Sequence, residues 1–581
     1  MRNRYYTFFL FAAIAFSALL ASCTKTYESV PLGQQEPLDI AFDPNDSSGV
    51  YAMRFLLTTY ANTLYDGFNR ISNDNLDAST DNAVSSQSGI PPVQNIVTGS
   101  YSATSTNGDD IWTNAYAGIR EATVFTVYIN RVPMIEVLPD GRNARPAYRS
   151  EARFLRANLY FELLKRYGGV PLLGDTIRQI DDNTQLPRAT FEECVNYIVS
   201  ELDNIKDSLR TSSSVTSNTY GRVTQGAAMA LKARVLLYAA SPLYNGGNID
   251  ASNPLTGYTN YDQSRWQRAA DAAKAVMDLG VYSLMPNFSD VFITQASPVG
   301  TNTETIFWRQ NGTNTSVEVN NAPVGYTTSG SRGYTSPTQN LVDSFPTIDG
   351  LDIGDPASGY NPDKPYENRD PRLAKTVFTN GALWLNRAVQ TYIGGADRPG
   401  GTIQQTKTGY YMRKFMGNFE SVNGAAVYSN TYHDFVYMRY AEMLLDFAEA
   451  TNEVLGPTGD VYNVLYAIRQ RAGINSGADN NYGIKQSMTQ DEMRSVIRKE
   501  ERLEFAFEEH RTWDLKRWKT AASVFASPLK GMNIQQSSSG QLFYNVAPVL
   551  TPQFRDPQMY LYPIPYSEVL KNPSMKQNPG W

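Results

Sequence analysis

The side chains best suited to chemistry are carboxylates that fall within apolar, helix-like stretches. Glu500 lies in register with Val496, Leu503 and Phe507, so a helix would bury its carboxylate. Two carboxylates at a suitable separation hydrolyse glycosidic bonds, but no pair stands out from the many acids of this chain. Buried charges are normally paired, so we interpret these groups as ion pairs between stacked helices rather than as an active site. The same interpretation covers Arg149, Glu151, Arg153, Glu442 and Glu449.

Metal and thiol chemistry have little support. His433 and His510 are the only 2 histidines and form no HExxH spacing, so a catalytic zinc site is not expected. Clustered oxygens in the stretch 74–81, including Asp81, could hold a structural calcium ion, although their spacing does not match an EF-hand. Cys194 lies in an apolar stretch and is interpreted as a small core residue. No other cofactor is expected.

Aromatic side chains offer a binding chemistry instead. The chain has 37 Tyr and 7 Trp, and much of the tyrosine lies in stretches rich in Gly, Asn, Ser and Thr. Rings held on polar loops can stack on the C–H face of a sugar, while neighbouring polar side chains bind its hydroxyl groups. The sequence therefore predicts a ligand-binding surface. The candidate ligand contacts are Tyr101, Trp112, Tyr326, Arg332, Tyr334, Trp384 and Tyr392.

The N-terminus predicts export and lipidation. Arg2 and Arg4 precede an apolar run over 8–20 that ends in Leu20-Ala21-Ser22-Cys23, which resembles a lipoprotein signal peptide. We expect 1–22 to be removed and Cys23 to carry acyl chains. A polar tether would follow over 23–46, and the lipid would be the only membrane anchor. The net charge of −6, more negative after loss of Arg2 and Arg4, argues against a nucleic-acid partner.

Hydrophobic periodicity predicts four pairs of helices that would position these groups. Apolar residues recur at i, i+3, i+4 and i+7 in each, as in helices that pack on a core. Thr190 and Thr489, each followed by acidic residues, are predicted N-caps. The four pairs cover 148–167 with 190–209, 224–238 with 264–279, 435–454 with 461–471, and 489–508 with 513–525.

A stretch of different composition separates the second pair from the third. It is rich in Gly, Asn, Thr, Pro and Tyr, has a strand-like run over 304–310, and is the predicted ligand face. A further helix is expected around 49–69 and an extended tail over 560–581. The predicted organisation is a signal peptide 1–22, a tether 23–46, a first helical region 47–280, a loop-rich insert 281–433 and a last helical region with tail 434–581.

Motifs spread over most of the chain resemble the SusD/RagB family of outer-membrane nutrient-binding lipoproteins of Bacteroidetes. They are RSEARFLRA at 149–157, KARVLLYAASPLY at 232–244, YMRYAEMLL at 437–445, RTWDLKRW at 511–518 and LYPIP at 561–565. One departure is Glu501, which stands where members commonly have Arg.

This resemblance implies a mainly α fold: tetratricopeptide-like helix pairs in a right-handed superhelical body, with a loop-rich insert that carries short strands. It implies a non-enzymatic protein, anchored in the outer membrane and facing outward. Such a protein binds an oligosaccharide and delivers it to a SusC-like TonB-dependent transporter. Three alternatives stay open: a peptide ligand, a tetratricopeptide-like scaffold for protein–protein contact, and, least supported, a surface hydrolase.

Overall fold

The computed structural model describes residues 38–179, 182, 185–216, 219–294, 301–326, 330–399, 405–417, 419 and 427–581. The predicted signal peptide 1–22, the predicted lipidation site Cys23 and most of the predicted tether lie outside these ranges. Within them, no helix is both long enough and apolar enough to cross a membrane.

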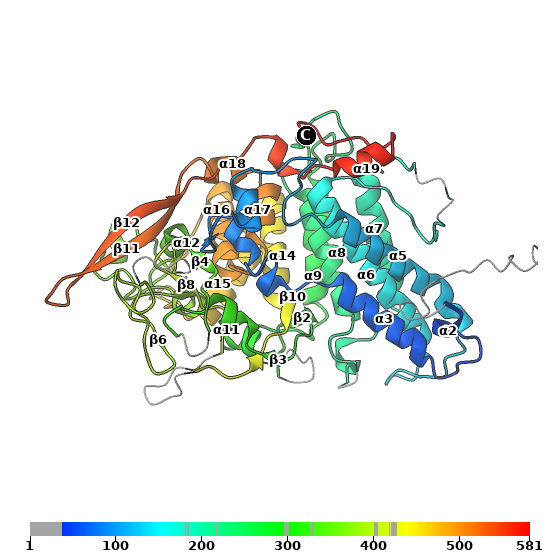
Figure 1. Cartoon of the computed structure of the whole chain (residues 1–581), viewed down its shortest axis with the longest axis horizontal. Coiled ribbons are helices and arrows are strands. Elements are labelled where there is room, and N and C mark those ends of the chain that lie inside the picture. Colours follow the sequence, from blue (N-terminus) through cyan, green and yellow to red (C-terminus); the bar gives the residue numbers. More distant parts are fainter. Residues whose placement is uncertain are drawn as a thin grey trace, which may run out of the picture.

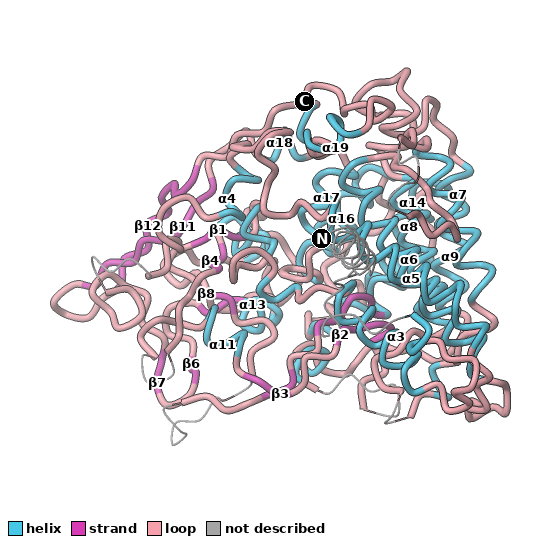
Figure 2. Tube along the Cα trace, turned by 45° about the vertical axis from the view of Figure 1, so that its right-hand side comes forward, coloured by secondary structure: helices cyan, strands magenta, loops and turns pink. Residues whose placement is uncertain are grey.

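The prediction of a mainly α fold is confirmed: most of the longer helices gather on one side of the molecule, and most of the short strands and long loops lie on the other (Figure 2). The longer helices are α3 (Val50–Thr63), α5 (Trp112–Tyr128), α6 (Ala144–Tyr167), α7 (Phe191–Ile205), α8 (Gln225–Ala240), α9 (Ser264–Met277), α14 (Tyr440–Leu455), α15 (Gly459–Ala472) and α16 (Gln490–Glu504). The shorter ones are α2 (Leu38–Ala41), α4 (Pro92–Val97), α10 (Asp290–Ile293), α11 (Ser316–Asn321), α12 (Gln339–Ser344), α13 (Pro371–Thr376), α17 (Arg511–Arg517), α18 (Ala521–Val524) and α19 (Tyr566–Lys571).

The strands form antiparallel pairs. In the described part of the chain each pair stands alone as a two-stranded sheet. The pairs are β1 (Ala83–Ser85) with β4 (Thr335–Pro337), β2 (Thr305–Arg309) with β10 (Phe435–Arg439), β3 (Thr313–Asn314) with β9 (Thr431–Tyr432), β5 (Val377–Phe378) with β8 (Tyr411–Met412), β6 (Leu383–Trp384) with β7 (Arg387–Ala388), and β11 (Leu529–Gln536) with β12 (Leu542–Leu550).

Each long helix packs mainly on its neighbours in the chain. Helix α6 packs on α5 and α7, and α8 on α7 and α9, which confirms the first two predicted pairs. Helix α9 then packs on α14, which follows the insert, and α14 packs on α15 and α16. The helices before and after the insert therefore form one continuous helical body (Figure 1).

Local sequence signals define where several helices begin and end. Thr190 and Thr489 are N-caps, as predicted, and each forms a capping box with the glutamate three residues later. At Thr190 the hydroxyl accepts the Glu193 N–H at 3.1 Å, and the Glu193 carboxylate accepts the Thr190 N–H at 2.7 Å. Helix α6 ends at Gly168, where φ is +75° and a Cβ would lie 2.3 Å from the Leu255 carbonyl oxygen. Only glycine fits that turn.

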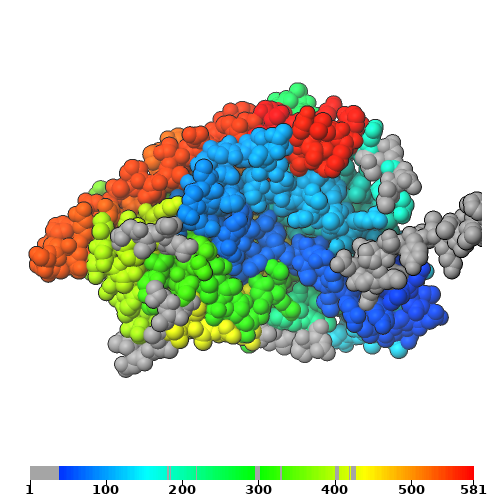
Figure 3. All heavy atoms as spheres, viewed as in Figure 1, coloured from blue at the N-terminus to red at the C-terminus, as the bar shows by residue number. Residues whose placement is uncertain are grey.

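Several predicted elements are wrong or incomplete. Residues 435–439 are not helical: they form strand β10, which pairs with β2, the strand predicted over 304–310. The last predicted helix is divided into α17 and α18, because Lys519 between them adopts a left-handed conformation with φ +57°. The tail over 560–581 contains the short helix α19. Helix α5 and the β11–β12 hairpin, which projects from the body in Figures 1 and 3, were not predicted.

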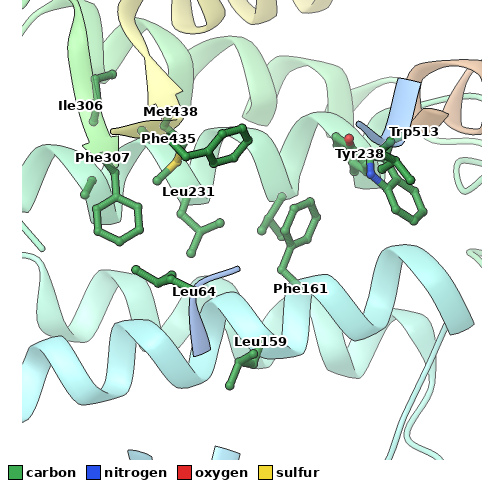
Figure 4. Packing of buried hydrophobic residues seen from close by; sticks show 14 of the residues in the cluster. Leu64, Leu159, Phe161, Leu231, Tyr238, Ile306, Phe307, Phe435, Met438 and Trp513 are labelled. Carbon is green, nitrogen blue, oxygen red and sulfur yellow. The ribbon is translucent and has the colours of Figure 1, made fainter. Parts of the chain in front are cut away.

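The core continues from the helices into the first strand of the insert. Figure 4 shows Phe161 of α6, Leu231 of α8 and Phe307 of β2 around one interior space. Phe161 meets Tyr238 edge-on, with ring centroids 5.1 Å apart. Cys194 is buried, as predicted, and burial raises the pKa of its thiol to about 12. The thiol is therefore a packing group rather than a nucleophile.

Buried arginines and glutamates connect the helical body to the insert. Arg439 pairs with Glu304 at 2.6 Å, with Glu504 at 2.7 Å and with Glu508 at 2.7 Å. Glu500 pairs with Arg372 of the insert and with Arg469 of the helical body. Within the helical body the pairs are Glu151 with Arg210 and Arg222, Arg153 with Glu201, Glu442 with Arg234, and Glu449 with Arg517. Arg149 donates to the Thr126 carbonyl. The interpretation as ion pairs is confirmed for the other charges but not for Arg149, which binds a carbonyl.

Candidate functional site

The insert contains an open cleft with a volume of about 490 Å³, which we call the insert cleft. Its walls come from the loop over 363–367, the segment from α13 to β6, Arg413 after β8, and Tyr544 of β12. Strands β6 and β12 lie on the loop-rich side of the molecule (Figure 2). The cleft thus forms where parts of the insert meet the projecting hairpin.

Two tyrosines form an aromatic corner in the insert cleft. The rings of Tyr366 and Tyr544, both half-buried, are 5.8 Å apart and nearly perpendicular, at 85°. The Tyr366 hydroxyl donates to the Tyr410 hydroxyl at 3.1 Å, because Tyr410 itself donates to Gln339 at 2.5 Å. Burial raises the pKa of Tyr366 and of Tyr544, so both hydroxyls stay protonated at neutral pH. The corner therefore offers neutral ring surface.

Hydrogen-bond donors and hydrogen-bond acceptors both surround this aromatic corner. The Asn380 side-chain oxygen accepts the Thr391 N–H at 2.9 Å, which orients the amide. The Arg413 guanidinium lies 4.9 Å from the centroid of the Phe378 ring. Burial lowers the pKa of Arg413 to about 10, so it stays charged at neutral pH. Exposed Lys375 adds a donor and exposed Asp363 adds an acceptor. Ring surface beside charged and amide groups suits a polyhydroxylated ligand.

The ion-pair network fixes the walls of the insert cleft. Asp370 caps α13 by accepting the Arg372 N–H at 2.9 Å. The Arg372 guanidinium then pairs with Glu500 at 2.7 Å and Glu504 at 3.1 Å, which ties α13 to α16. The pairing of β5 with β8 brings Arg413 close to the turn that holds Asn380. The cleft is therefore built on rigid supports.

Four of the predicted ligand contacts lie in the core instead. The exposed fraction is 5% for Tyr101, 4% for Trp112, 3% for Tyr326 and 0% for Trp384. Trp384 is covered by Tyr326, with centroids 4.9 Å apart, and by Tyr428 at 5.8 Å. A ring enclosed in this way has no face for a sugar, so we correct the prediction for these four residues.

The two N-terminal members of that group pack far from the insert cleft. Tyr101 packs against Trp581 of the C-terminal tail, with centroids 5.0 Å apart. Trp112 opens helix α5 and meets Tyr167 of α6 edge-on at 5.1 Å. Their rings hold the tail and the first helices together.

The other three predicted contacts remain accessible: Arg332 is exposed, and Tyr334 and Tyr392 are half-buried. The Tyr334 carbonyl accepts the Ser86 N–H at 2.7 Å, and Lys407 donates to the Gln87 carbonyl at 3.2 Å. We call the surface of Gln87, Arg332, Tyr334 and Lys407 the junction surface, because the insert meets the N-terminal segment there. Ligand contact by Arg332, Tyr334 and Tyr392 stays a prediction.

The acidic stretch over 74–81 uses its carboxylates within the protein. Asp81 pairs with Arg502 at 2.8 Å and with Arg511 at 2.8 Å, and Asp77 accepts the Phe507 N–H at 2.7 Å. Asp74 accepts from Ser85 at 2.7 Å. In the described part of the chain, no three His, Cys, Asp or Glu side chains are grouped so as to hold a metal ion. These contacts engage the carboxylates of the acidic stretch within the protein, and a structural calcium ion there stays a prediction.

Tyr366, Asn380, Arg413 and Tyr544 were not among the predicted contacts. The only sequence signal for the first is that Tyr366 lies in a Gly-, Asn-, Pro- and Asp-rich segment of the insert. Nothing in the sequence placed Tyr544 beside it, because the hairpin was not predicted.

The fold and the insert cleft define a helical-repeat protein with a loop-rich insert that presents an aromatic and polar cleft. Two models of one family match the chain: the SusD family over 294–581, and a SusD-like group described as starch-binding, associating with outer membrane, over 38–237. The chain belongs to the SusD/RagB family.

Relatives and solved structures agree with this assignment. The SusD-like protein P2 of Formosa agariphila is 24% identical over 493 residues, which cover 82% of each chain. A SusD-like protein of Bacteroides fragilis has a similar structure, with a TM-score of 0.74 at 26% identity, covering 94% of this chain and 100% of that one. A SusD-like carbohydrate binding protein of B. fragilis has a TM-score of 0.70 at 23% identity, covering 91% and 99%.

Proposed function

We propose that this protein is an outer-membrane lipoprotein of the cell surface that captures an oligosaccharide and delivers it to a SusC-like TonB-dependent transporter. The observation that carries the proposal is the insert cleft. Its tyrosine corner supplies ring faces for stacking, and Asn380, Arg413 and Asp363 supply donors and acceptors for hydroxyl groups. A cleft of about 490 Å³ can hold a few sugar rings.

The comparisons support this choice of ligand. One matching family model carries the description starch-binding, associating with outer membrane, and a protein of similar fold is described as carbohydrate binding. Lipidation of Cys23 would anchor the protein in the membrane that holds the proposed transporter. The outward orientation and the transporter partner are part of the proposal.

The proposed mechanism is capture without a chemical step. A glycosidase needs two carboxylates free to act as acid and as base or nucleophile. The glutamates that first suggested such a pair are held by arginines: Glu500 by Arg372 and Arg469, and Glu449 by Arg517. Burial acts to raise the pKa of Glu500, but Arg372 and Arg469 outweigh it and lower the pKa, so this carboxylate stays ionised and cannot serve as the general acid.

Calorimetric titration of the protein without its signal peptide (residues 24–581) against neutral oligosaccharides tests the site. We expect Tyr366→Ala to weaken binding about tenfold, or about 1.4 kcal/mol, because one stacking face is lost. Tyr51→Ala, which removes an exposed ring from α3, is the matched control and should bind like the wild type.

Tyr334→Ala is measured in parallel. If this substitution abolishes binding while Tyr366→Ala has no effect, the ligand binds at the junction surface and the assignment to the insert cleft is wrong. If no oligosaccharide binds but peptides do, the peptide alternative replaces the proposal. If neither oligosaccharides nor peptides bind and the protein still captures the transporter, the scaffold alternative replaces the proposal.

A further inference from the structure

A second cleft of about 490 Å³ lies in the helical body, and we call it the body cleft. Its lining comes from the loop after α8, from Tyr261 and Trp266, from Glu453 of α14, from Arg494 and Arg498 of α16, and from Trp518. All of these residues lie outside the predicted insert 281–433. A ligand here would therefore be separate from one in the insert cleft.

Arg498 differs from the paired arginines of the helical body because it has no salt bridge within the described part of the chain. Its guanidinium lies 4.8 Å from the centroid of the Trp518 ring, and it is half-buried. Its Nε is buried without a hydrogen-bond partner. Among the described residues, no carboxylate forms a salt bridge with it, whereas its neighbour Arg494 pairs with Glu453 and Asp491.

Two of the acids whose charges act on Arg498, Glu449 and Glu501, pair with Arg517 instead. Glu449 accepts from Arg517 at 2.7 Å and from the Trp518 indole N–H at 2.7 Å. Glu501 accepts from Arg517 at 3.2 Å through Oε2, while its Oε1 is buried without a hydrogen-bond partner. Among the charged side chains that line the cleft, Arg494 and Glu453 pair with each other, so Arg498 is the lining cation without a salt bridge to a described residue. A half-buried cation without an anionic partner favours an anionic ligand.

Tyr261 supplies a second recognition element at the same cleft. Its side chain is 62% exposed, although a large aromatic ring on a folded surface is usually better covered. Asn245, in contrast, has its amide engaged: the oxygen accepts from Arg265 at 2.6 Å and the nitrogen donates to the Asp262 carbonyl at 3.0 Å. The cleft therefore presents one open ring and one unpaired guanidinium.

We propose that the body cleft is a second carbohydrate site that selects acidic sugars. The Arg498 guanidinium would bind a uronate carboxylate or a sulfate ester through paired N–H···O bonds, and Tyr261 would stack on the face of the same sugar. The choice of a sugar, rather than another small anion, rests on the proposed function. The presence of an anion site rests on the lining residues alone.

Titration of residues 24–581 with trigalacturonate, a sulfated neutral trisaccharide, galactotriose and inorganic sulfate tests this inference. We expect an acidic trisaccharide to bind, and Arg498→Gln to weaken that binding at least tenfold with no effect on neutral oligosaccharides. The two acidic probes separate carboxylate from sulfate recognition. Tyr261→Ala should weaken binding of the same acidic trisaccharide several-fold.

Arg54→Gln is the matched control, because Arg54 also lies over a ring, that of Tyr51 at 5.5 Å, but lines neither cleft. It should leave all affinities unchanged. Thermal unfolding of Arg498→Gln checks that the body stays folded.

Failure of all acidic probes to bind the wild type, or unchanged affinity in Arg498→Gln, overturns the second site. Binding of inorganic sulfate but of neither acidic trisaccharide leaves an anion site and overturns the carbohydrate assignment. Loss of acidic binding in Tyr366→Ala instead places those ligands in the insert cleft. The effect of Tyr366→Ala on neutral oligosaccharides tests the proposed function separately.

Discussion

Replacing Arg439 with methionine should destabilise the protein by removing one cation from a buried network. The substitution keeps an apolar stem but deletes the group that pairs with Glu304, Glu504 and Glu508. Breaking a buried ion pair typically costs about 3–5 kcal/mol, because a charge is left without its partner.

The ion pairs that remain place the expected loss in the free energy of unfolding near the lower end of that range. Glu304 and Glu504 keep Arg471, Glu504 also keeps Arg372, and Glu508 keeps Lys414 at 2.6 Å. Each carboxylate therefore retains at least one cation, and we expect a loss of about 3 kcal/mol in the free energy of unfolding.

Urea unfolding followed by tryptophan fluorescence measures this loss. Lys571→Met is the control, because Lys571 forms an exposed pair with Glu568 at 2.9 Å and should contribute little. A loss below about 1 kcal/mol in Arg439→Met would show that the network does not hold the insert on the helices, contrary to our reasoning.

Two further predictions concern Asp81 and Trp384. Burial acts to raise the pKa of Asp81, but Arg502 and Arg511 outweigh it and hold the pKa at about 2. The stability that Asp81 contributes should therefore be complete above about pH 4 and be lost as the pH falls toward 2, by about 2 kcal/mol. A stability difference between wild type and Asp81→Asn that stays constant from pH 5 to pH 2 would contradict this. Trp384→Phe should lower the unfolding free energy by about 1–3 kcal/mol and leave oligosaccharide affinity unchanged, because the ring is a core group. Calorimetry that finds weaker binding at unchanged stability would restore Trp384 as a ligand contact.

The sequence predicted the elements that local signals determine. The N-caps at Thr190 and Thr489 and the apolar stripes of α6 and α14 depend on residues a few positions apart. Strand β10 was predicted as helix because its apolar spacing is helix-like. The prediction failed because pairing with β2, which is distant in the chain, overrides that local preference. The same long-range pairing hides the register of short strands in the insert from any local pattern.

Site residues were harder to predict because burial is decided by distant partners. In the sequence, Tyr101 and Tyr326 resemble exposed aromatic residues of loops. In the structure, Trp581 of the tail covers Tyr101 and Trp384 covers Tyr326. Tyr366 and Tyr544 come together only because the hairpin lies beside the insert. Composition correctly indicated that aromatic rings and polar loops share the insert, but not which rings keep an open face.

The most direct test of the central claim is calorimetric titration of residues 24–581 against a panel of neutral oligosaccharides and peptides, with chromatographic recovery of each ligand afterwards. We predict saturable binding of at least one oligosaccharide and its recovery intact. Absence of oligosaccharide binding would contradict the account. So would release of a shorter sugar that stops when a single Asp or Glu is substituted.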